Sequence, residues 1–298
     1  MSAPAVQLWP GLFYAVAGAI AFSAKAIIVK LAYRYGVDAV TLIMLRMLFA
    51  LPLFAAMAWW ASRGRAPLSA RDWGGVLALG FLGYYLSSFL DFAGLQYITA
   101  SLERLILYLN PTLVLVLGWL LYRKPFRRAQ LAGMAISYAG VLLVFAHEVG
   151  AFGPDTAWGA LLVLGSAVSY ALYLVYSGQL VQRLGSLRLV GLATSVACLC
   201  CIVQFLLLRP ASSAFAVAPE VVWLSVLNAT LCTALPVLLV MMAIERIGPA
   251  LSAQSGMVGP LSTIAMGALI LDEPFTAWIA AGTALVLAGI WVFSRSGR

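Results

Sequence analysis

Long, uninterrupted apolar stretches constrain this chain more than any other feature of its sequence. Each is close to the roughly 20 residues that an α-helix needs to cross a bilayer, and none alternates as a half-buried strand would. Backbone polar groups in lipid must be satisfied within their own segment, which favours helices. The sequence therefore predicts an all-α polytopic membrane protein with ten transmembrane helices: Leu8–Leu31, Val40–Ala61, Trp73–Gly94, Ile98–Tyr122, Ala129–Ala146, Trp158–Val181, Leu189–Leu208, Val221–Ile244, Pro249–Leu271 and Phe275–Ser294.

The composition excludes several other classes of protein. Of the 298 residues, 64% are hydrophobic and 9% are charged, whereas an ordinary soluble domain is about 25% charged. So few charges cannot cover a water-soluble enzyme, a disordered chain or a secreted disulfide scaffold. The formal net charge of +8 comes without a long basic run, so we expect no nucleic-acid partner.

The remaining reactive residue types indicate no cofactor and no metal. The four cysteines lie inside apolar stretches and are interpreted as small buried hydrophobic residues. The single histidine, His147, is expected in a loop. No charged residue precedes the first span, which starts by Leu8, so we expect no cleavable signal.

The loops predict the orientation of the spans. Twelve of the 18 basic residues lie in the loops after spans 2, 4, 6 and 8 or at the C-terminus. The loops after spans 5 and 9 contain acidic residues and no Lys or Arg. Because basic loops stay in the cytoplasm, we expect a multi-pass protein of the cytoplasmic (inner) membrane with both termini cytoplasmic.

The chain also contains an internal repeat. A shift of 149 residues places Leu95–Val144 on Ile244–Phe293 without a gap, and twelve of these 50 pairs are identical. The identical pairs include Pro111 with Pro260 and the Pro125-Phe126 turn with its counterpart. Five spans per repeat is an odd number, so the two halves must have opposite orientations. The predicted organisation is an inverted 5+5 repeat, with halves at residues 1–146 and 157–298, which is a transporter architecture.

At this point the residues resemble a known family. Leu102–Gly140 and Leu251–Gly289 each contain a Pro within a long span, a polar-Pro-Phe turn and a small-residue helix, and Ala19–Leu53 is similar to the family's first two spans. Together they resemble the EamA family of the drug/metabolite transporter superfamily. Members often have an acidic residue before the Pro-Phe-like turn in both halves, whereas this chain has one, Glu273, only in the second.

Within that family the aromatic-rich first, third and sixth spans are most similar to YddG-type exporters of aromatic amino acids. The resemblance implies a central cavity lined mainly by spans 1, 3, 4, 6, 8 and 9, with spans 5 and 10 at the periphery. The substrate class it implies is aromatic and other neutral amino acids and related metabolites.

Ionisable residues inside the spans are candidates for function because they are costly in a membrane. All of them fall in the first four spans, within about 10 Å of the predicted outer helix ends. In one interpretation Lys25 binds a substrate carboxylate, and Asp91 or Glu103 binds an ammonium group. In the other, these residues are structural ion pairs or snorkelling side chains. The six residues are Lys25, Lys30, Arg46, Asp91, Glu103 and Arg104.

Polar and aromatic residues near the middle of spans are further candidates for a cavity wall. A hydroxyl at that depth needs a partner or water, although buried amides also serve as contacts between helices. The predicted substrate-binding set contains Lys25, Asp91, Glu103, Tyr84, Tyr85, Ser88, Tyr108, Asn110, Tyr170, Tyr173, Asn228 and Gln254.

Proline and glycine residues at matching positions predict hinges. Pro111 and Pro260 each remove a helix hydrogen bond, and Gly259 weakens span 9 further. Paired interruptions of this kind are typical of transport sites, although a static kink is the alternative. The glycines of spans 5 and 10 are explained by close helix packing alone.

The function predicted from these features is a secondary transporter, an exporter of amino acids that works by alternating access. Spans 5 to 10 contain no ionisable residue between their ends apart from tyrosine and cysteine, which favours exchange or uniport over a proton relay. The alternatives are transport of a nucleotide sugar or sugar phosphate, or a channel. No motif of an intramembrane enzyme or of an ATP-driven pump occurs. The expected partners are an amino acid-like substrate and the lipid bilayer, and the chain is expected as a monomer or homodimer.

Overall fold

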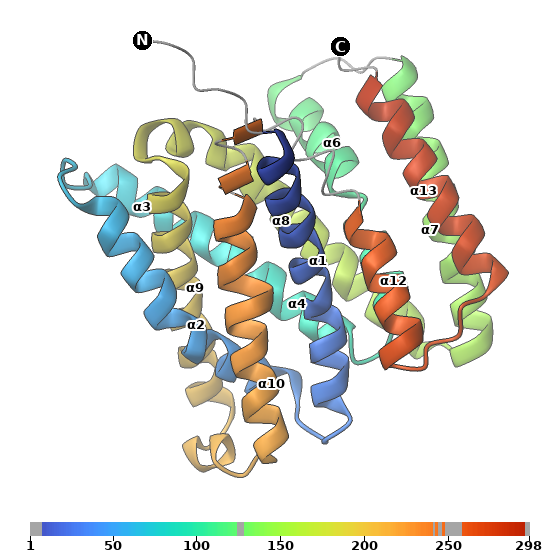
Figure 1. Ribbon diagram of the computed structural model, residues 1–298, viewed down its shortest axis with the longest axis horizontal. Helices are drawn as coiled ribbons and strands as arrows, with labels where there is room; N and C mark the ends of the chain where they lie inside the picture. The colour runs from blue at the N-terminus through green and yellow to red at the C-terminus, as the bar shows by residue number, and fades with distance from the viewer. Residues whose placement is uncertain (1–7, 124–127, 241, 244–245, 248–257, 296–298) are drawn as a thin grey trace.

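The computed structural model describes residues 8–123, 128–240, 242–243, 246–247 and 258–295, and across these ranges the regular structure is helical, with no strand (Figure 1). The elements in chain order are α1 (Leu8–Tyr33), α2 (Ala39–Ser62), α3 (Ala70–Leu79), η1 (Gly80–Leu86), α4 (Ser87–Gly94), α5 (Ala100–Leu107), α6 (Asn110–Tyr122), α7 (Arg128–Phe152), α8 (Asp155–Leu184), α9 (Ser186–Leu208), η2 (Ala211–Ala214), α10 (Pro219–Ala229), η3 (Thr230–Ala234), α12 (Val258–Ile270) and α13 (Ala277–Arg295).

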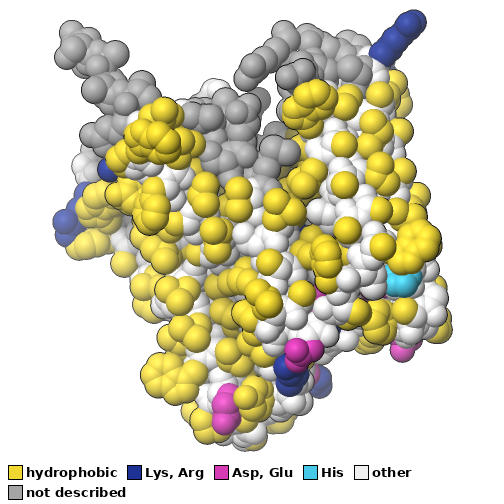
Figure 2. All heavy atoms as spheres, turned by 45° about the vertical axis from the view of Figure 1, so that its right-hand side comes forward, with side chains coloured by type: hydrophobic (Ala, Val, Ile, Leu, Met, Phe, Trp, Pro, Cys, Tyr) yellow, Lys and Arg dark blue, Asp and Glu magenta, His cyan; other side chains and the backbone are white. Residues whose placement is uncertain are grey.

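The outside of the bundle is apolar, as a lipid-facing surface must be. Eight of the described helical segments are long and apolar enough to cross a membrane, and two shorter apolar helices, Val258–Ile270 and Ala277–Val292, follow them. Large side chains such as Trp9 and Leu269 are 79% and 83% exposed. Figure 2 shows hydrophobic side chains covering the flank, with charged ones near the ends. The prediction of an all-α, multi-span membrane protein is confirmed, while the number of ten full spans stays a prediction.

The bundle has two ends that differ in content. The first helix, α1, begins and the last, α13, ends at the same end, which we call the terminal end (Figure 1). At the opposite, distal end, α1 finishes, α4 connects to α5, and α12 connects to α13. The distal end contains most of the described acidic groups outside the central region, and its charged cluster is described below.

The 149-residue shift seen in the sequence also relates details of the backbone. α7 begins at Arg128 and α13 at Ala277, which are 149 positions apart. The two π-helical segments η1 and η3 fall on matching positions under the same shift. Arg123 and Asp272 are the two described non-glycine residues with positive φ, at 52° and 59°, and they are also 149 positions apart. Each takes the left-handed conformation two residues before a Pro-Phe pair in the sequence, and a left-handed residue commonly ends a helix.

Two pairs of matching helices pack against each other in antiparallel fashion. In the α2–α9 pair, the Arg188 guanidinium contacts Ser62, while Cys198 lies against Met47 further along. In the α7–α13 pair, Ser137 donates to Val286 O at 3.4 Å, and a Cβ on Gly140 would lie 2.6 Å from Gly282 O. The close packing predicted for these glycines is therefore confirmed, because no larger residue fits there.

Several boundaries differ from the predictions. α7 continues to Phe152, so His147 and Glu148 are helical rather than in a loop, and Glu148 is buried. The helix ends only where Gly153 takes a φ of +93°. The statement that spans 5 to 10 lack an ionisable residue inside their ends is therefore wrong for α7. The fourth predicted span is divided into α5 and α6, with a turn at Tyr108 and Leu109. Three cysteines are buried as predicted and Cys200 is partly exposed, and all four are free.

Candidate functional site

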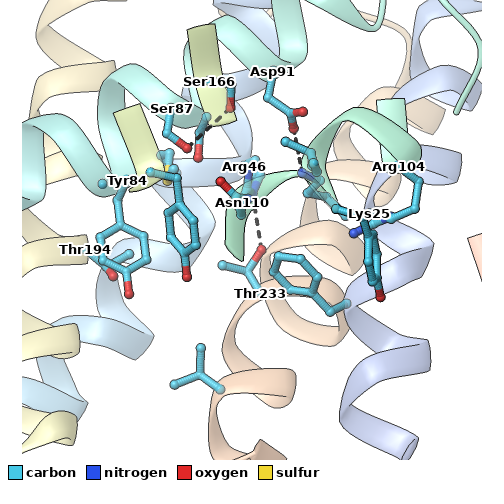
Figure 3. Close-up of a pocket in the computed structure, with 18 of the residues that line it drawn as sticks. Lys25, Arg46, Tyr84, Ser87, Asp91, Arg104, Asn110, Ser166, Thr194 and Thr233 are labelled. Carbon is cyan, nitrogen blue, oxygen red and sulfur yellow. Dashed lines mark hydrogen bonds and ion pairs between the residues drawn. The ribbon is translucent and has the colours of Figure 1, made fainter. Parts of the chain in front are cut away.

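A cavity of about 340 Å³ lies inside the bundle, and its wall is built from both halves of the chain (Figure 3). The first half contributes α1, α2, η1, α4, α5 and α6, and the second contributes α8, α9 and η3. The volume falls within the range of about 300–1,000 Å³ that is usual for small-molecule sites. The lining residues are Phe22, Lys25, Arg46, Met47, Phe54, Gly83, Tyr84, Ser87, Ser88, Asp91, Arg104, Leu107, Tyr108, Asn110, Pro111, Ser166, Tyr170, Thr194, Thr233 and Val237.

A buried cluster of four charges forms one side of this cavity. The Lys25 ammonium lies 2.5 Å from Asp91 Oδ2 and 3.5 Å from Glu103 Oε1. Arg104 reaches Glu103 at 3.8 Å and also donates from Nε to Thr263 Oγ1 at 3.0 Å. Lys25, Asp91 and Arg104 face the cavity, whereas Glu103 is fully buried behind them. Two cations neutralise two carboxylates, so the cluster is balanced in charge.

The opposite side of the cavity is aromatic. Tyr84 comes from the π-helical segment η1, and its hydroxyl lies 3.2 Å from the hydroxyl of Tyr173. The rings of Tyr170 and Tyr173 are stacked with centroids 5.5 Å apart. η1 can approach this group closely because residue 83 is glycine: a Cβ there would collide with the Tyr173 ring. A π-helical turn frequently marks a functional site, and here it brings a tyrosine to the wall.

Buried polar atoms without a hydrogen-bond partner gather around the cavity. Among the described residues they include Arg46 Nη1, Asp91 Oδ1 and Asn110 Oδ1, all from lining side chains. Asn228 Oδ1, just behind the wall, is another, although its amide nitrogen approaches Lys25 O at 3.5 Å. Because native interiors satisfy nearly all their buried polar groups, such a concentration indicates a site that a polar ligand completes.

The predicted binding residues divide into those on the wall and those behind it. Tyr85, Glu103, Tyr173 and Asn228 are not part of the lining, and Gln254 lies outside the described residues. Glu103 and Tyr173 contact wall residues directly, whereas Tyr85 packs against Phe81, with ring centroids 5.1 Å apart. The structure brings together at the wall Lys25, Tyr84, Ser88, Asp91, Tyr108, Asn110 and Tyr170.

The sequence analysis missed part of the wall. Arg46, Met47 and Phe54 come from α2 and Thr194 comes from α9, two helices that correspond to spans 2 and 7. The expectation that the wall is formed mainly by spans 1, 3, 4, 6, 8 and 9 is therefore incomplete. No described residue of α12 lines the cavity. The sequence contains a signal for this part of the wall in Arg46 itself, an ionisable residue inside a predicted span.

The predicted hinge residues occupy different positions. Pro111 lies in the first turn of α6, directly after the break at Tyr108 and Leu109, and it lines the cavity. Gly259 lies where Ser23 Oγ donates to its carbonyl at 2.9 Å, and a Cβ there would lie 2.9 Å from Tyr108 Oη. Pro260 is buried in α12, and the residues just before α12 lie outside the described part. A hinge role for these three residues stays a prediction.

A second charged region lies at the distal end, where Glu273 caps α5. Its Oε1 accepts from the backbone N–H of Ala100 at 2.7 Å, and its Oε2 accepts from the Ser101 hydroxyl at 3.1 Å. A carboxylate at this position is favourable because the first N–H groups of a helix have no partner within it. Thr99 adds the ordinary N-cap bond by accepting from Leu102 N at 3.0 Å.

Lys30 and Glu148 hold the same connection between α4 and α5, and Arg34 holds the turn between α12 and α13. Lys30 donates to Ile98 O at 2.8 Å and to Leu95 O at 3.4 Å. Glu148 accepts from the Thr99 hydroxyl, and Arg34 donates to Leu271 O at 2.6 Å. We call Lys30, Arg34, Glu148 and Glu273 the distal clamp, since together they join α1, α7 and the α12–α13 turn to the start of α5.

A charged and aromatic cavity inside a bundle of apolar helices is typical of membrane transport proteins. The chain matches the EamA-like transporter family over residues 9–146 and 157–295, and it belongs to that family. It is a membrane transporter.

The relatives agree with this assignment. The chain is 29% identical over 268 residues to "Uncharacterized transporter YcbK" of Bacillus subtilis (strain 168), which covers 88% of this chain and 86% of that protein. It is 24% identical over 256 residues to "Uncharacterized transporter" of Archaeoglobus fulgidus, which covers 86% and 87%. A solved structure titled "Crystal structure of protein" has a similar fold, with a TM-score of 0.61 at 20% identity over 97% of this chain and 98% of that one.

Proposed function

We propose that this transporter exports amino acids, chiefly aromatic and other neutral ones, and related metabolites. The observation that carries the proposal is the central cavity, whose wall combines charged side chains, tyrosine rings and buried polar atoms without partners. A zwitterion needs an anion or dipole for its ammonium group and a donor for its carboxylate. Asp91 Oδ1 and Asn110 Oδ1 offer free acceptors on the same wall.

The aromatic side of the cavity suits an aromatic side chain. Tyr84 and Tyr170 lie on the wall, with Tyr173 stacked behind them. Aromatic rings attract one another beyond the gain from buried area, by about 0.5–1.5 kcal/mol per well-placed pair. The tyrosine side therefore favours a substrate with an aromatic ring, while the charged side holds its polar end.

We propose further that the chain crosses the membrane ten times as an inverted 5+5 repeat. The shared 149-residue shift of helix starts, π segments and left-handed residues supports this architecture. The antiparallel packing of α2 with α9 and of α7 with α13 supports the inversion. In this architecture the halves rock about the central cavity to expose it to one side and then the other.

The orientation that we propose from the loops places the terminal end on the cytoplasmic side of the inner membrane. Arg63, Arg65, Arg123 and Arg183 lie at or near helix ends of that side, and basic residues stay in the cytoplasm. The distal clamp then closes the outer side in this conformation, so export requires the clamp to open.

Transport by exchange or uniport fits the balanced charge cluster. Lys25 and Arg104 lie beside Asp91 and Glu103, so the formal charges of the four side chains sum to zero. A proton-coupled carrier would instead need a carboxylate that changes its protonation state during the cycle.

A sugar phosphate or nucleotide sugar is the second candidate substrate. A phosphate carries more than one negative charge, and its recognition favours several free cations. Of the three cations on the wall, Lys25 and Arg104 are already paired with carboxylates, so this candidate is weaker.

The test is counterflow in liposomes containing the purified protein. Vesicles loaded with unlabelled phenylalanine are diluted into a trace of labelled phenylalanine, with no proton gradient imposed. We expect labelled phenylalanine to accumulate saturably in the vesicles. Unlabelled tryptophan or leucine should reduce this accumulation by competition, and a sugar phosphate should not. Label that equilibrates without overshoot would indicate a channel, and a strict need for a proton gradient would contradict exchange or uniport.

A further inference from the structure

We infer that Arg46 is the residue of the cavity that binds the carboxylate of the transported molecule, an inference that deepens the proposed function and rests on it. Arg46 belongs to α2, is 6% exposed and lines the cavity. In Figure 3 Arg46 lies in the central part of the labelled wall, and a dashed line joins it to Thr233. From the sequence, one interpretation places the substrate carboxylate on Lys25 instead.

The local contacts orient the guanidinium and leave part of it free. Arg46 Nε donates to Thr233 Oγ1 at 3.2 Å, and Thr233 in turn donates to Asn228 O at 2.8 Å. The Phe92 ring centroid lies 5.1 Å from Arg46 Cζ, which places the guanidinium against an aromatic face. These contacts use Nε and one face of the group, whereas Nη1 is buried without a hydrogen-bond partner.

Arg46 also differs from the other two cations of the wall in having no ion pair. Among the described residues, no carboxylate oxygen lies within 4.0 Å of its nitrogens, whereas Lys25 and Arg104 both have such partners. Asp91 is near enough to act on the guanidinium electrostatically but does not pair with it directly, and a buried charge without a direct partner is unfavourable. An anion that enters the cavity would satisfy both the charge and the unused donor.

The chemistry of the wall points to a carboxylate. The planar guanidinium matches the two oxygens of a carboxylate in a bidentate pair. Asp91 Oδ1, which has no partner, faces the same cavity, and it would attract an ammonium group while repelling a dianion such as a phosphate. Arg46 thus has an unused donor, and Asp91 has an unused acceptor although its other oxygen is ion-paired with Lys25. A donor and an acceptor on a shared wall fit a zwitterion.

The experiment measures ligand binding by the purified protein in detergent, through the shift of its melting temperature, and counterflow in liposomes. The probes are phenylalanine, phenylacetate, which carries only the carboxylate, and phenethylamine, which carries only the ammonium group. The variants are R46Q and R46K. The matched control is R188Q, because Arg188 is 7% exposed in α9, lies outside the cavity and binds Ser62 and Ala66 instead.

We expect R46Q to weaken phenylacetate and phenylalanine binding by about 10–100-fold, the range for a lost hydrogen bond to a charged group, and to leave phenethylamine binding within about twofold. R46K should retain part of the affinity, and R188Q all of it. A purely structural Arg46 would lower the melting temperature without changing this preference among the three probes.

The outcomes separate the inference from the proposed function. Phenylacetate binding that R46Q leaves unchanged, or no phenylacetate binding by the wild type, would overturn the role of Arg46. Phenylacetate binding that depends on Arg46, together with no counterflow of any amino acid, would support the inference and contradict the amino acid substrate. Amino acid counterflow that is equal in R46Q and the wild type would support the amino acid substrate and contradict the role of Arg46.

Discussion

The distal clamp and the central cavity contain similar charged residues in opposite conditions. In the clamp, Lys30 and Arg34 donate to backbone carbonyls, and Glu273 accepts from the first N–H groups of α5. In the cavity, Arg46 Nη1 and Asp91 Oδ1 are buried without partners. The clamp thus satisfies its charges with the chain itself, and the cavity leaves donors and acceptors for another molecule.

The hydrogen bonds of a buried charge therefore indicate whether it stabilises the fold or is suited to binding a ligand. A charge whose hydrogen bonds all go to fixed backbone groups holds elements together, because removing it leaves those groups unpaired. A charge with an unused donor or acceptor beside a cavity is suited to binding. The same distinction separates Lys25 and Arg46, which lie on one wall: Lys25 is ion-paired with Asp91 and Glu103, and Arg46 has no carboxylate within reach among the described residues.

The largest effect is expected from breaking the charge cluster of the cavity. D91N removes the carboxylate that lies 2.5 Å from the Lys25 ammonium, and loss of one partner of a buried pair costs about 3–5 kcal/mol. We expect a lower melting temperature in detergent and loss of phenylalanine counterflow. Asp155 is exposed at the start of α8, so D155N is the control and should behave as the wild type. A D91N variant with unchanged melting temperature and counterflow would mean that the charge cluster is needed neither for stability nor for transport.

A smaller effect, of a different kind, is expected in the clamp. E273Q weakens the cap of α5, and loss of a helix cap costs about 0.5–2 kcal/mol. We expect a lower melting temperature with phenylalanine affinity unchanged within about twofold. The matched control is E220Q, since Glu220 is exposed in the first turn of α10. If E273Q changed substrate affinity as strongly as the cavity variants, the division between clamp and cavity would fail.

The aromatic side of the cavity offers a comparison within one helix. Tyr170 lines the cavity, whereas Tyr176, six residues later in α8, is exposed on the outside. Y170A removes a ring worth about 0.5–1.5 kcal/mol in a ring–ring contact, so we expect the KM for phenylalanine to rise by up to about tenfold. The KM for alanine should change less, and Y176A should alter neither. Equal effects of the two substitutions in transport assays would argue against aromatic contacts at this wall.

The smallest effect concerns the charge of Asp38, the N-cap of α2. Partial burial acts to raise its pKa, but hydrogen bonds from the Thr41 hydroxyl and N–H, with Arg209 nearby, outweigh burial and hold the pKa of Asp38 below its usual value. A lowered folded pKa means that the ionised form adds stability above the unfolded value of about 4. That stability is lost as the pH falls through the folded pKa.

The measurement for Asp38 is the melting temperature of the wild type and of D38N from pH 7 down to pH 3. We expect the wild type to be more stable by about 0.3–1 kcal/mol near neutral pH, as for a charge at a helix N-terminus. The two curves should converge in acid. A difference that stays constant with pH would show that the charge of Asp38 is not the cause. Glu273 in the distal clamp also caps a helix, so the result gives a reference value for the stability that such a cap contributes there.

Much of the molecule could be predicted from the chain alone. Continuous apolar stretches predicted helices, and the positions of Lys25, Asp91 and Asn110 inside such stretches identified part of the wall. The split between α5 and α6 could be anticipated from Pro111, because proline removes a backbone donor and fits best in a first turn. The extension of α7 to Phe152 could not, since a buried Glu148 looks like a loop residue until Thr99 is seen as its partner.

The class of the protein follows from the amino-acid sequence, because the hydrophobicity and length of its apolar stretches decide what can lie in a bilayer. The sequence also determines the repeat, since the shift of 149 residues relates side chains before it relates helices. Which charged side chains keep unused hydrogen-bonding atoms depends on how the helices pack. Lys25 and Arg46 are both ionisable residues inside predicted spans, and the sequence favours Lys25 as the binding residue. In the structure α4 and α5 bring Asp91 and Glu103 to Lys25, whereas among the described residues no carboxylate pairs directly with Arg46 on the same cavity wall. A partner's position depends on helix packing across the bundle, which no local pattern in the sequence encodes.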